Sequence, residues 1–274
     1  MNCHSLRNKT AGVQHILNND VKLCFLQETF MKAHDSAIFN EVREMGLNTF
    51  SIPRPQVEHG GLGLIYDPSI NVKLVSKSSL RRYKTFEYCE FTLKTNQCSL
   101  RFCNIYRRPY SAKHRFTIND FLVEFDTYLA ELIHKPGHAI VLGDLNIHFE
   151  KSDDSYAQSL KDIFYQYDFI RSTHEELSTH KYGGQLDVIY YSNALPMSVS
   201  NAIVLTDGTM SDHFMIYSTI QCEPDMIQQT IYEKYRSYKN IDLQRFKQDI
   251  KLSGLGRVHE LPDSRDTIDN IVSL

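Results

Sequence analysis

Short apolar runs of β-strand type alternate with segments of helical periodicity along this chain, and this alternation constrains the fold more than any other feature. The clearest helix is predicted over residues 117–134, where the apolar residues form one stripe. Residues 85–94 and 98–107 are predicted to be paired strands around a short polar turn. Strand pairs mixed with helices are typical of a layered α/β fold. The pattern leaves open one doubly wound sheet or two packed sheets with helices outside.

The remaining elements follow from the same periodicities. Helices are expected at residues 10–19, 36–45 and 154–167, and strands at residues 186–191, 199–205 and 214–221. Gly60 and Gly61 predict a turn that enters a buried strand. A phosphate-binding glycine loop is a poor interpretation of this turn, because no helix with Lys or Ser/Thr follows it.

The composition divides the chain near Pro224. The whole chain has 274 residues, of which 42% are hydrophobic, and this is enough for one large domain with a short extension. After Pro224 the sequence is polar and rich in Tyr, although residues 241–251 could form a short amphipathic helix. We therefore expect one domain over residues 1–222 and a linker or tail over residues 223–274.

The charge does not favour a nucleic-acid binder. The formal net charge is -3, the isoelectric point is near 6.5, and nucleic-acid-binding domains are usually basic. Phosphate contacts can nevertheless be local, and short basic clusters occur at residues 81–84, 107–108 and 113–115. Solvated loops are the alternative interpretation of these clusters.

The cysteines and the hydropathy pattern indicate an intracellular protein. None of the six cysteines forms a Cys-x-x-Cys pair, so a cysteine-based zinc site is not expected. The N-terminus does not resemble a signal peptide, and no apolar run is long enough to span a membrane. We expect reduced thiols, a location in the nucleus or cytoplasm, and no membrane partner.

Acidic, amide and imidazole side chains stand beside several predicted strands. These are Glu28 after residues 21–26, Asp144 and Asn146 after residues 138–142, and Asp212 and His213 before residues 214–217. Carboxylates hold hard cations, and a histidine with an acidic partner can transfer protons. Each motif alone is common in turns, but the combination is what metal-assisted phosphoester cleavage requires. The other histidines, including His4 and His180, show no ligand spacing and are expected at the surface.

The order of these motifs resembles the endonuclease/exonuclease/phosphatase superfamily and, within it, the apurinic-type endonuclease domain of non-LTR retrotransposons. The motifs are Asn2, residues 27–29, residues 106–109, residues 143–146, residues 186–189 and residues 211–213. Residues 2–9 and 186–192 are typical of the retrotransposon group. The resemblance covers about residues 1–221. It implies a four-layer α/β/β/α sandwich, in which two packed mixed sheets are flanked by helices and the motif loops gather at one edge.

The resemblance also implies a role for each site residue. Glu28 would be the main ligand of Mg²⁺, with Mn²⁺ as a possible substitute, and Asp212 would complete the metal side. Asp144 would orient or deprotonate the attacking water, Asn146 would hold that water and the phosphate, and Asn2 would hydrogen-bond Asp144. Tyr106 would contact the scissile phosphate. His213, oriented by Asp187, would stabilise the pentacovalent phosphorus or supply a proton. Arg107, Arg108 and Thr179 would bind the substrate.

The resulting expectation is a Mg²⁺-dependent endonuclease that nicks duplex DNA, fused in a full-length element to a reverse transcriptase absent from this chain. A phosphatase or phosphodiesterase acting on inositide or lipid headgroups is an alternative that fits the acidic isoelectric point better. A third alternative is an inactive remnant, because only Met1 precedes Asn2 where the superfamily places an inner strand. We therefore expect the first strand to be truncated.

Overall fold

The structure is a computed structural model that describes residues 1–17, 21–32, 35–54, 59–79, 82–109, 115–174, 177–205, 211–223 and 242–253. The chain divides into two compact units, Met1–Gln229 and Thr230–Leu274. Part of the predicted basic clusters (residue 81 and residues 113–114) and most of the predicted tail lie outside the described residues.

The larger sheet of the first unit has six strands in the order β4-β5-β6-β7-β9-β8. These strands are β4 (Val72–Lys77), β5 (Phe86–Lys94), β6 (Ser99–Arg107), β7 (His138–Asp144), β9 (Asp187–Ser192) and β8 (Phe169–Arg171). Strands β6 and β7 are parallel, and the other neighbours are antiparallel. The predicted pair at residues 85–94 and 98–107 is therefore confirmed, and the sheet is mixed.

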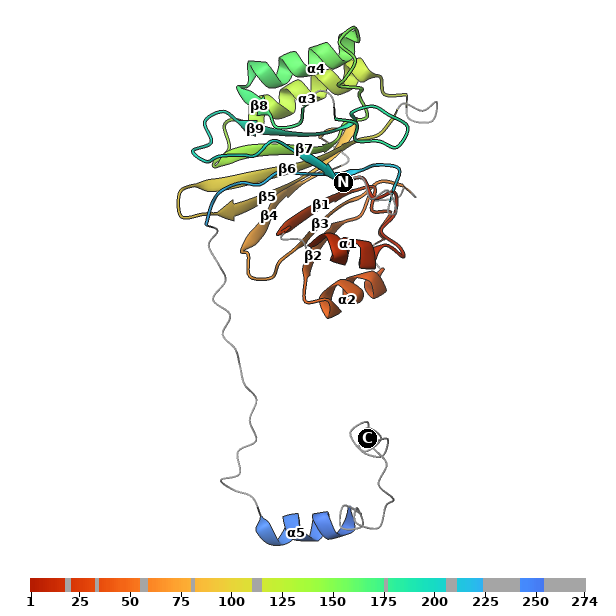
Figure 1. The fold of residues 1–274 in the computed structure, drawn as a ribbon, viewed down its shortest axis with the longest axis vertical. Coiled ribbons are helices and arrows are strands. Elements are labelled where there is room, and N and C mark those ends of the chain that lie inside the picture. Colours follow the sequence, from red (N-terminus) through yellow and green to blue (C-terminus); the bar gives the residue numbers. More distant parts are fainter. Residues whose placement is uncertain are drawn as a thin grey trace. The chain divides into compact units, whose positions relative to one another are not determined.

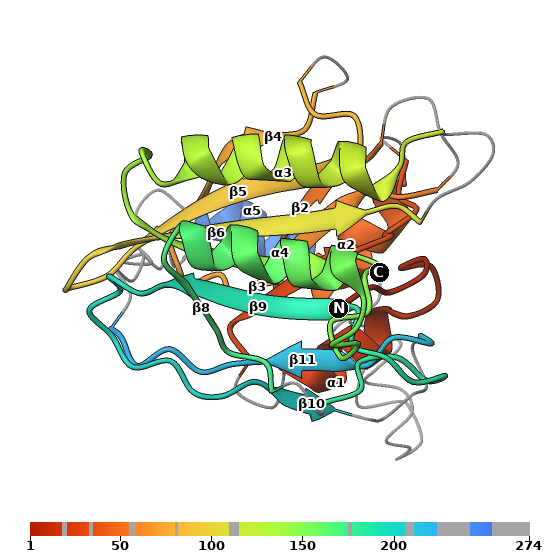
Figure 2. The same cartoon turned by 90° about the horizontal axis from the view of Figure 1, so that it is seen from above.

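Two helices cover one face of this sheet (Figures 1 and 2). They are α3 (Ile118–Leu132) and α4 (Ser155–Gln166). Thr117 and Asp120 form a capping box at the start of α3, which satisfies backbone N–H groups that a helix leaves without partners. The core between helices and sheet is rich in fully buried aromatic rings, including Phe121, Phe125, Tyr128 and Phe164.

A second sheet lies on the opposite side of the six-stranded sheet (Figure 1). Its strands β1 (Leu23–Gln27), β3 (Leu62–Tyr66) and β2 (Asn48–Ile52) are antiparallel in the order β1-β3-β2. Helices α1 (Thr10–Leu17) and α2 (Ser36–Glu44) lie on its outer side. One apolar cluster, with Phe25, Leu64, Phe91 and Phe102, joins the facing strands of the two sheets. The predicted α/β class with mixed sheets is confirmed.

The last two strands of the domain are shorter than the sequence predicts. The predicted strands at residues 199–205 and 214–221 form β10 (Ile203–Leu205) and β11 (Met215–Tyr217), which pair as a separate antiparallel ribbon. Beyond them the two segments meet through one isolated bridge, between Val199 and Ile220. The polarity of these segments alternates as in strands, but they form a regular ladder only between Ile203–Leu205 and Met215–Tyr217. Elsewhere their pairing is irregular.

A cavity of about 450 Å³ lies beside β1 and β11. Its lining is largely apolar and includes Leu23, Phe25, Ile189 and Ile216. Met1 also lines the cavity, because the first residues run parallel to the end of β1. The Met1 amino group donates to the Phe25 carbonyl at 2.9 Å, and the Gln27 N–H donates to the Met1 carbonyl at 3.1 Å. Asn2 is thereby held at the end of β1.

The second unit contains helix α5 (Leu243–Leu252), which lies in the segment where a short amphipathic helix was expected. Its N-cap is Asp242, whose carboxylate accepts from the N–H groups of Gln244 and Arg245. Its apolar side chains are exposed. Among the helices that the structure describes, none has the length and apolar character required to cross a membrane.

Candidate active site

Strand register brings three of the predicted site residues into one row. Asp144, at the end of β7, is the partner of Tyr106 on β6 and of Asp187 on β9. The row lies at the edge of the sheet where β6 and β7 end and β9 begins, so the loops at this edge lie around it. A parallel neighbour on one side and an antiparallel neighbour on the other therefore place three distant sequence motifs side by side.

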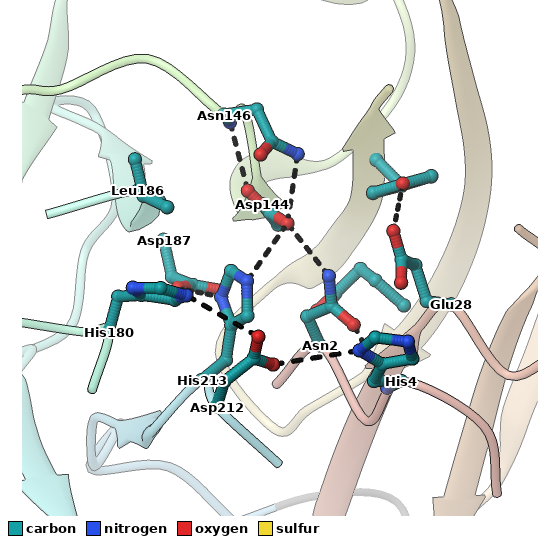
Figure 3. A network of polar contacts seen from close by, with 12 residues as sticks. Asn2, His4, Glu28, Asp144, Asn146, His180, Leu186, Asp187, Asp212 and His213 are labelled. Atoms are coloured by element: carbon teal, nitrogen blue, oxygen red, sulfur yellow. Dashed lines mark hydrogen bonds and ion pairs between the residues drawn. The ribbon is translucent and has the colours of Figure 1, made fainter. Parts of the chain in front are cut away.

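The Asp144 carboxylate is the centre of this row and is completely buried. It accepts from the Asn2 amide at 2.9 Å, the Asn146 N–H at 2.9 Å and the Asn146 amide at 3.1 Å (Figure 3). Burial, and after it the charge of Asp187, raises the pKa of Asp144 well above its usual range, although His213 and Asn2 oppose this. A carboxylate with a raised pKa is suited to accept a proton near neutral pH.

The residue before Asp144 must be glycine. Gly143 has a φ of +139°, and a Cβ there would lie 1.9 Å from the Ile105 carbonyl oxygen on β6. A side chain would therefore push β6 away from β7 and displace Asp144 from the row. Two residues further on, Asn146 has a φ of +50°, and Glu28 at the end of β1 has a φ of +51°. Left-handed backbone at a non-glycine residue is strained, less so for Asn than for Glu.

His213 faces Asp144 from the loop that leads into β11. Its Nδ1 contacts the Asp187 carboxylate at 2.9 Å, and its Nε2 is 3.8 Å from the Asp144 carboxylate. Burial lowers the pKa of His213, but the hydrogen bond to Asp187 and the charges of Asp187, Asp144 and Asp212 outweigh burial and raise it to about 9. The imidazole is therefore protonated at neutral pH and can donate a proton.

Glu28 and Tyr106 meet on the other side of Asp144. The Tyr106 hydroxyl donates to the Glu28 carboxylate, and the tyrosine is buried. Burial and the neighbouring charge of Glu28 raise the pKa of Tyr106. The tyrosine thus stays protonated, and its hydroxyl can act as a hydrogen-bond donor but not as a base.

The structure gives Arg107 and Thr179 different surroundings from those predicted. Arg107 is buried, and its guanidinium donates to the carbonyl oxygens of Leu145 at 2.5 Å and of Asn146 at 2.7 Å. These bonds hold the turn that carries Asn146, so Arg107 positions that turn. Arg108 is more exposed and remains the candidate of this pair for substrate binding.

Thr179 is also buried, and its hydroxyl accepts from the N–H groups of Leu186 at 3.0 Å and of Asp187 at 3.1 Å. Its carbonyl accepts from the Phe214 N–H at 2.8 Å. Thr179 therefore ties the start of β9 to the loop with His213. We interpret it as a residue that orients the pair of Asp187 and His213, in contrast with the predicted contact to a phosphate.

Asp212 lies between two histidines that the sequence pattern did not single out. His4 Nδ1 is 3.7 Å from one carboxylate oxygen, and His180 Nε2 is 3.6 Å from the other (Figure 3). His4 and His180 were expected at the surface without ligand spacing; His4 is exposed and His180 is partly buried, and both rings lie near Asp212. Sequence spacing could not reveal the cluster, because its members are 32 or more residues apart and meet only through the fold.

The site has the ligands that a divalent cation requires. Within the described residues, two groups have ligand atoms within 4.8 Å of one another: Asp144, Asp187 and His213, and His180, Asp212 and His213. Oδ1 of Asp187 is buried without a hydrogen-bond partner among these residues, and such an atom calls for a water or an ion. Glu28 and Asp212 are partly exposed carboxylates near this cluster (Figure 3), and carboxylate oxygens are the ligands that Mg²⁺ prefers.

Known proteins with a similar sequence or fold agree with this geometry. Residues 100–217 match the family described as endonuclease-reverse transcriptase. No curated protein matches the chain. The catalytic domain of APE2 from Xenopus laevis is similar in structure, with a TM-score of 0.63, 14% identity, and coverage of 83% of this chain and 92% of that one.

Two other solved structures share the fold. The 3' phosphatase NExo from Neisseria, bound to a product DNA hairpin, has a TM-score of 0.62 and 16% identity, and covers 80% of this chain and 96% of its own. The endonuclease domain of TRAS1, a telomere-specific non-LTR retrotransposon, has a TM-score of 0.59 and 14% identity, with coverage of 81% and 96%. The family match over residues 100–217 and the shared fold thus support the predicted resemblance to the endonuclease/exonuclease/phosphatase superfamily.

Proposed function

We propose that this chain is a Mg²⁺-dependent endonuclease that hydrolyses phosphodiester bonds of duplex DNA, in the manner of target nicking by a retrotransposon. One observation carries the proposal: the buried Asp144 carboxylate lies between two asparagine amides and a histidine that is paired with Asp187. A base and an acid with raised pKa values, held on adjoining strands, are suited to in-line attack on a phosphate.

The metal side of the site would be formed by Glu28 and Asp212. Their carboxylates supply the hard oxygen ligands of Mg²⁺, and Mn²⁺ accepts the same ligands. When bound, the cation would neutralise charge on the phosphate oxygens. Asn2 would fix the edge of the site, because its side-chain N–H donates to Asp144 while its side-chain oxygen accepts from the His4 backbone N–H at 3.0 Å.

The chain's own residues would then move the protons. Asp144 would take a proton from the attacking water, and Asn146 would hold that water and a phosphate oxygen through its amide. The protonated His213 would stabilise the pentacovalent phosphorus or donate to the departing oxygen. Asp187 would keep the ring in place. The Tyr106 hydroxyl would donate a hydrogen bond to the scissile phosphate, and Arg108 would contact the neighbouring backbone phosphates.

The fold supports this proposal at the level of its layers. We infer that the domain is the four-layer α/β/β/α sandwich expected from the sequence, with the site at one edge of the two sheets. The match to an endonuclease-reverse transcriptase family also favours DNA as the partner. In a longer protein, a reverse transcriptase following this domain would use the nick as its primer.

The test is conversion of supercoiled plasmid to open circle by the purified chain. We expect nicking with Mg²⁺ or Mn²⁺, none with EDTA, and a large loss in Asp144→Asn, which keeps the size of the side chain. Asp153→Asn is the matched control, because Asp153 is exposed whereas Asp144 is completely buried. Equal nicking by wild type and Asp144→Asn would identify a contaminating nuclease. Release of phosphate from an inositide or a 3'-phosphorylated end without any nicking would favour a phosphatase instead.

A further inference from the structure

The proposed reaction leaves two histidines beside Asp212 without a role. Their separations from its oxygens, 3.7 Å for His4 Nδ1 and 3.6 Å for His180 Nε2, are longer than hydrogen bonds between such groups. They are instead close to the separation of roughly 3.3 Å between two ligands of one tetrahedral zinc ion, which follows from metal–ligand bonds of about 2.0–2.1 Å. The spacing therefore suits a cation held between imidazole and carboxylate.

His213 completes a set of three ligands. One ligand atom each from His180, Asp212 and His213 lies within 4.8 Å of the others. The backbones of His180 and His213 are joined by an antiparallel bridge, and their rings meet edge to face with centroids 4.9 Å apart. Lys181 donates its N–H to the Asp212 carbonyl at 2.7 Å. Both segments that carry the ligands are thus fixed to each other by backbone hydrogen bonds.

We propose that His180, Asp212 and His213 bind a borderline divalent cation of the Zn²⁺ class, with His4 on the other oxygen of Asp212 as the fourth ligand. Imidazole ligands favour zinc, copper and nickel, whereas Mg²⁺ prefers oxygen alone. The set shares Asp212 with the carboxylates that would hold Mg²⁺ and differs from them in its imidazole ligands. His4 has an exposed side chain, so it can move toward a cation at little cost.

Binding at this site has a consequence for the reaction. A cation held there would occupy His213, which the proposed reaction places at the phosphate, and Asp212, which it places on the metal side. Zn²⁺ would therefore inhibit the enzyme, and added Mg²⁺ could compete with it only for the Asp212 carboxylate, because Mg²⁺ prefers oxygen ligands. This consequence rests on the proposed function, whereas the binding itself does not.

The binding is tested with the full chain by titrating Zn²⁺ against a chromophoric chelator. His180→Asn should weaken zinc affinity by at least about tenfold, since even second-shell changes at zinc sites cost 10–100-fold. His148→Asn is the matched control, because His148 contacts Glu150 at 2.7 Å in a histidine–carboxylate pair outside the three-ligand group. His4→Asn should weaken binding less and serves if His180→Asn does not fold. Equal affinity in wild type and both site variants would overturn the proposal.

The inhibition is tested by nicking at constant Mg²⁺ with increasing Zn²⁺. Measured against each variant's own rate with Mg²⁺ alone, the zinc concentration for half inhibition should rise at least about tenfold in His180→Asn. Inhibition at the same concentration in wild type and His180→Asn would overturn the inhibitory role. If neither the wild type nor any variant nicks DNA, but zinc affinity still depends on His180, then the proposed function is wrong and the metal site stands.

Discussion

The two apolar regions of the domain differ in how completely they are filled. Between the six-stranded sheet and helices α3 and α4, aromatic rings pack against one another, and the rings of Phe164 and Tyr190 stack with centroids 3.7 Å apart. Beside β1 and β11, a cavity of about 450 Å³ remains. The row of Tyr106, Asp144 and Asp187 stands on β6, β7 and β9, which have the filled region on one face and the second sheet with the cavity on the other. Asn2, Glu28, Asp212 and His213 come from segments outside this sheet. The site therefore has one half on the six-stranded sheet and one half on segments outside it.

Stability should divide along the same line, and we expect the largest effect here. Leu129→Ala on α3 should lower the free energy of unfolding by about 2–5 kcal/mol, because it leaves a void in a filled core. Leu23→Ala on β1 should lower it by less than about 2 kcal/mol, since part of that surface already faces the cavity. Urea denaturation measures both. The difference in helix propensity between Leu and Ala is small beside the expected loss, so equal losses would show that the two regions are packed alike.

Catalysis should need both halves of the site. Asp144→Ala removes a group from the half on the six-stranded sheet, and His213→Ala removes one from the other half. Each should lower the nicking rate by roughly 10²-fold or more, as expected for loss of general acid–base help. His148→Ala is the control for the histidine. An unchanged nicking rate in a folded His213→Ala variant would show that the half of the site with His213 takes no part in the reaction.

The pH dependence of stability should report the contact between the halves. The pKa of His213 is raised to about 9 in the folded chain, from about 6.5 in an unfolded one. The folded state then binds the extra proton between these values, so its contribution to stability is complete below pH 6.5 and is lost as the pH rises through 9. Denaturation without divalent cations at pH 6, 7.5 and 9 should show this fall in wild type and a smaller fall in His213→Gln. Parallel curves would mean that Asp187 and Asp144 do not hold the proton.

Filling the cavity should sharpen the comparison with a smaller gain. Five to eight alternating apolar residues fused before Met1 would continue the parallel pairing that begins between Met1 and β1. Burial of two or three side chains contributes roughly 1.5–3 kcal/mol each, reduced by the entropy of ordering the strand. We expect a rise of a few degrees in melting temperature and a higher nicking rate. The control is the same extension with its apolar and polar positions exchanged. An equal rise in melting temperature with this control would show that the gain does not come from filling the cavity.

The smallest effect concerns the two adjacent arginines. Arg108→Glu should raise the KM for DNA and reduce the salt slope of binding by about one phosphate contact. Arg107→Glu should instead lower the melting temperature, because its guanidinium holds the backbone at Leu145 and Asn146. Filter binding at several salt concentrations, with a thermal melt of each variant, separates the two. A loss of salt slope in Arg107→Glu without loss of stability would restore its predicted role at the phosphate.

The elements and the members of the row could be predicted from local signals. Helix α3 was predicted from its apolar stripe, and Asp144 from its place after a buried strand. The pairing of Asp187 with His213 was expected from the family resemblance, and the two side chains do meet. These local signals therefore identify which segments form strands and which residues lie at the strand ends.

The surroundings of the site residues could not be predicted in the same way. Arg107 and Thr179 look like surface groups in the sequence, yet backbone groups from other segments surround them. The two histidines beside Asp212, His4 and His180, come from two separate loops. The cavity has no local signature, since it depends on how far β11 lies from β1. These properties arise only when distant segments pack together.

The left-handed backbone at Glu28 and Asn146 has a consequence for directed evolution. Both residues could be replaced by glycine without strain, and the removal of an unfavourable conformation commonly stabilises a protein. A library selected only for thermal resistance or for yield would thus be drawn toward glycine at two positions of the site. Stability would improve while activity declined. Any selection on this domain therefore has to reward cleavage and folding together.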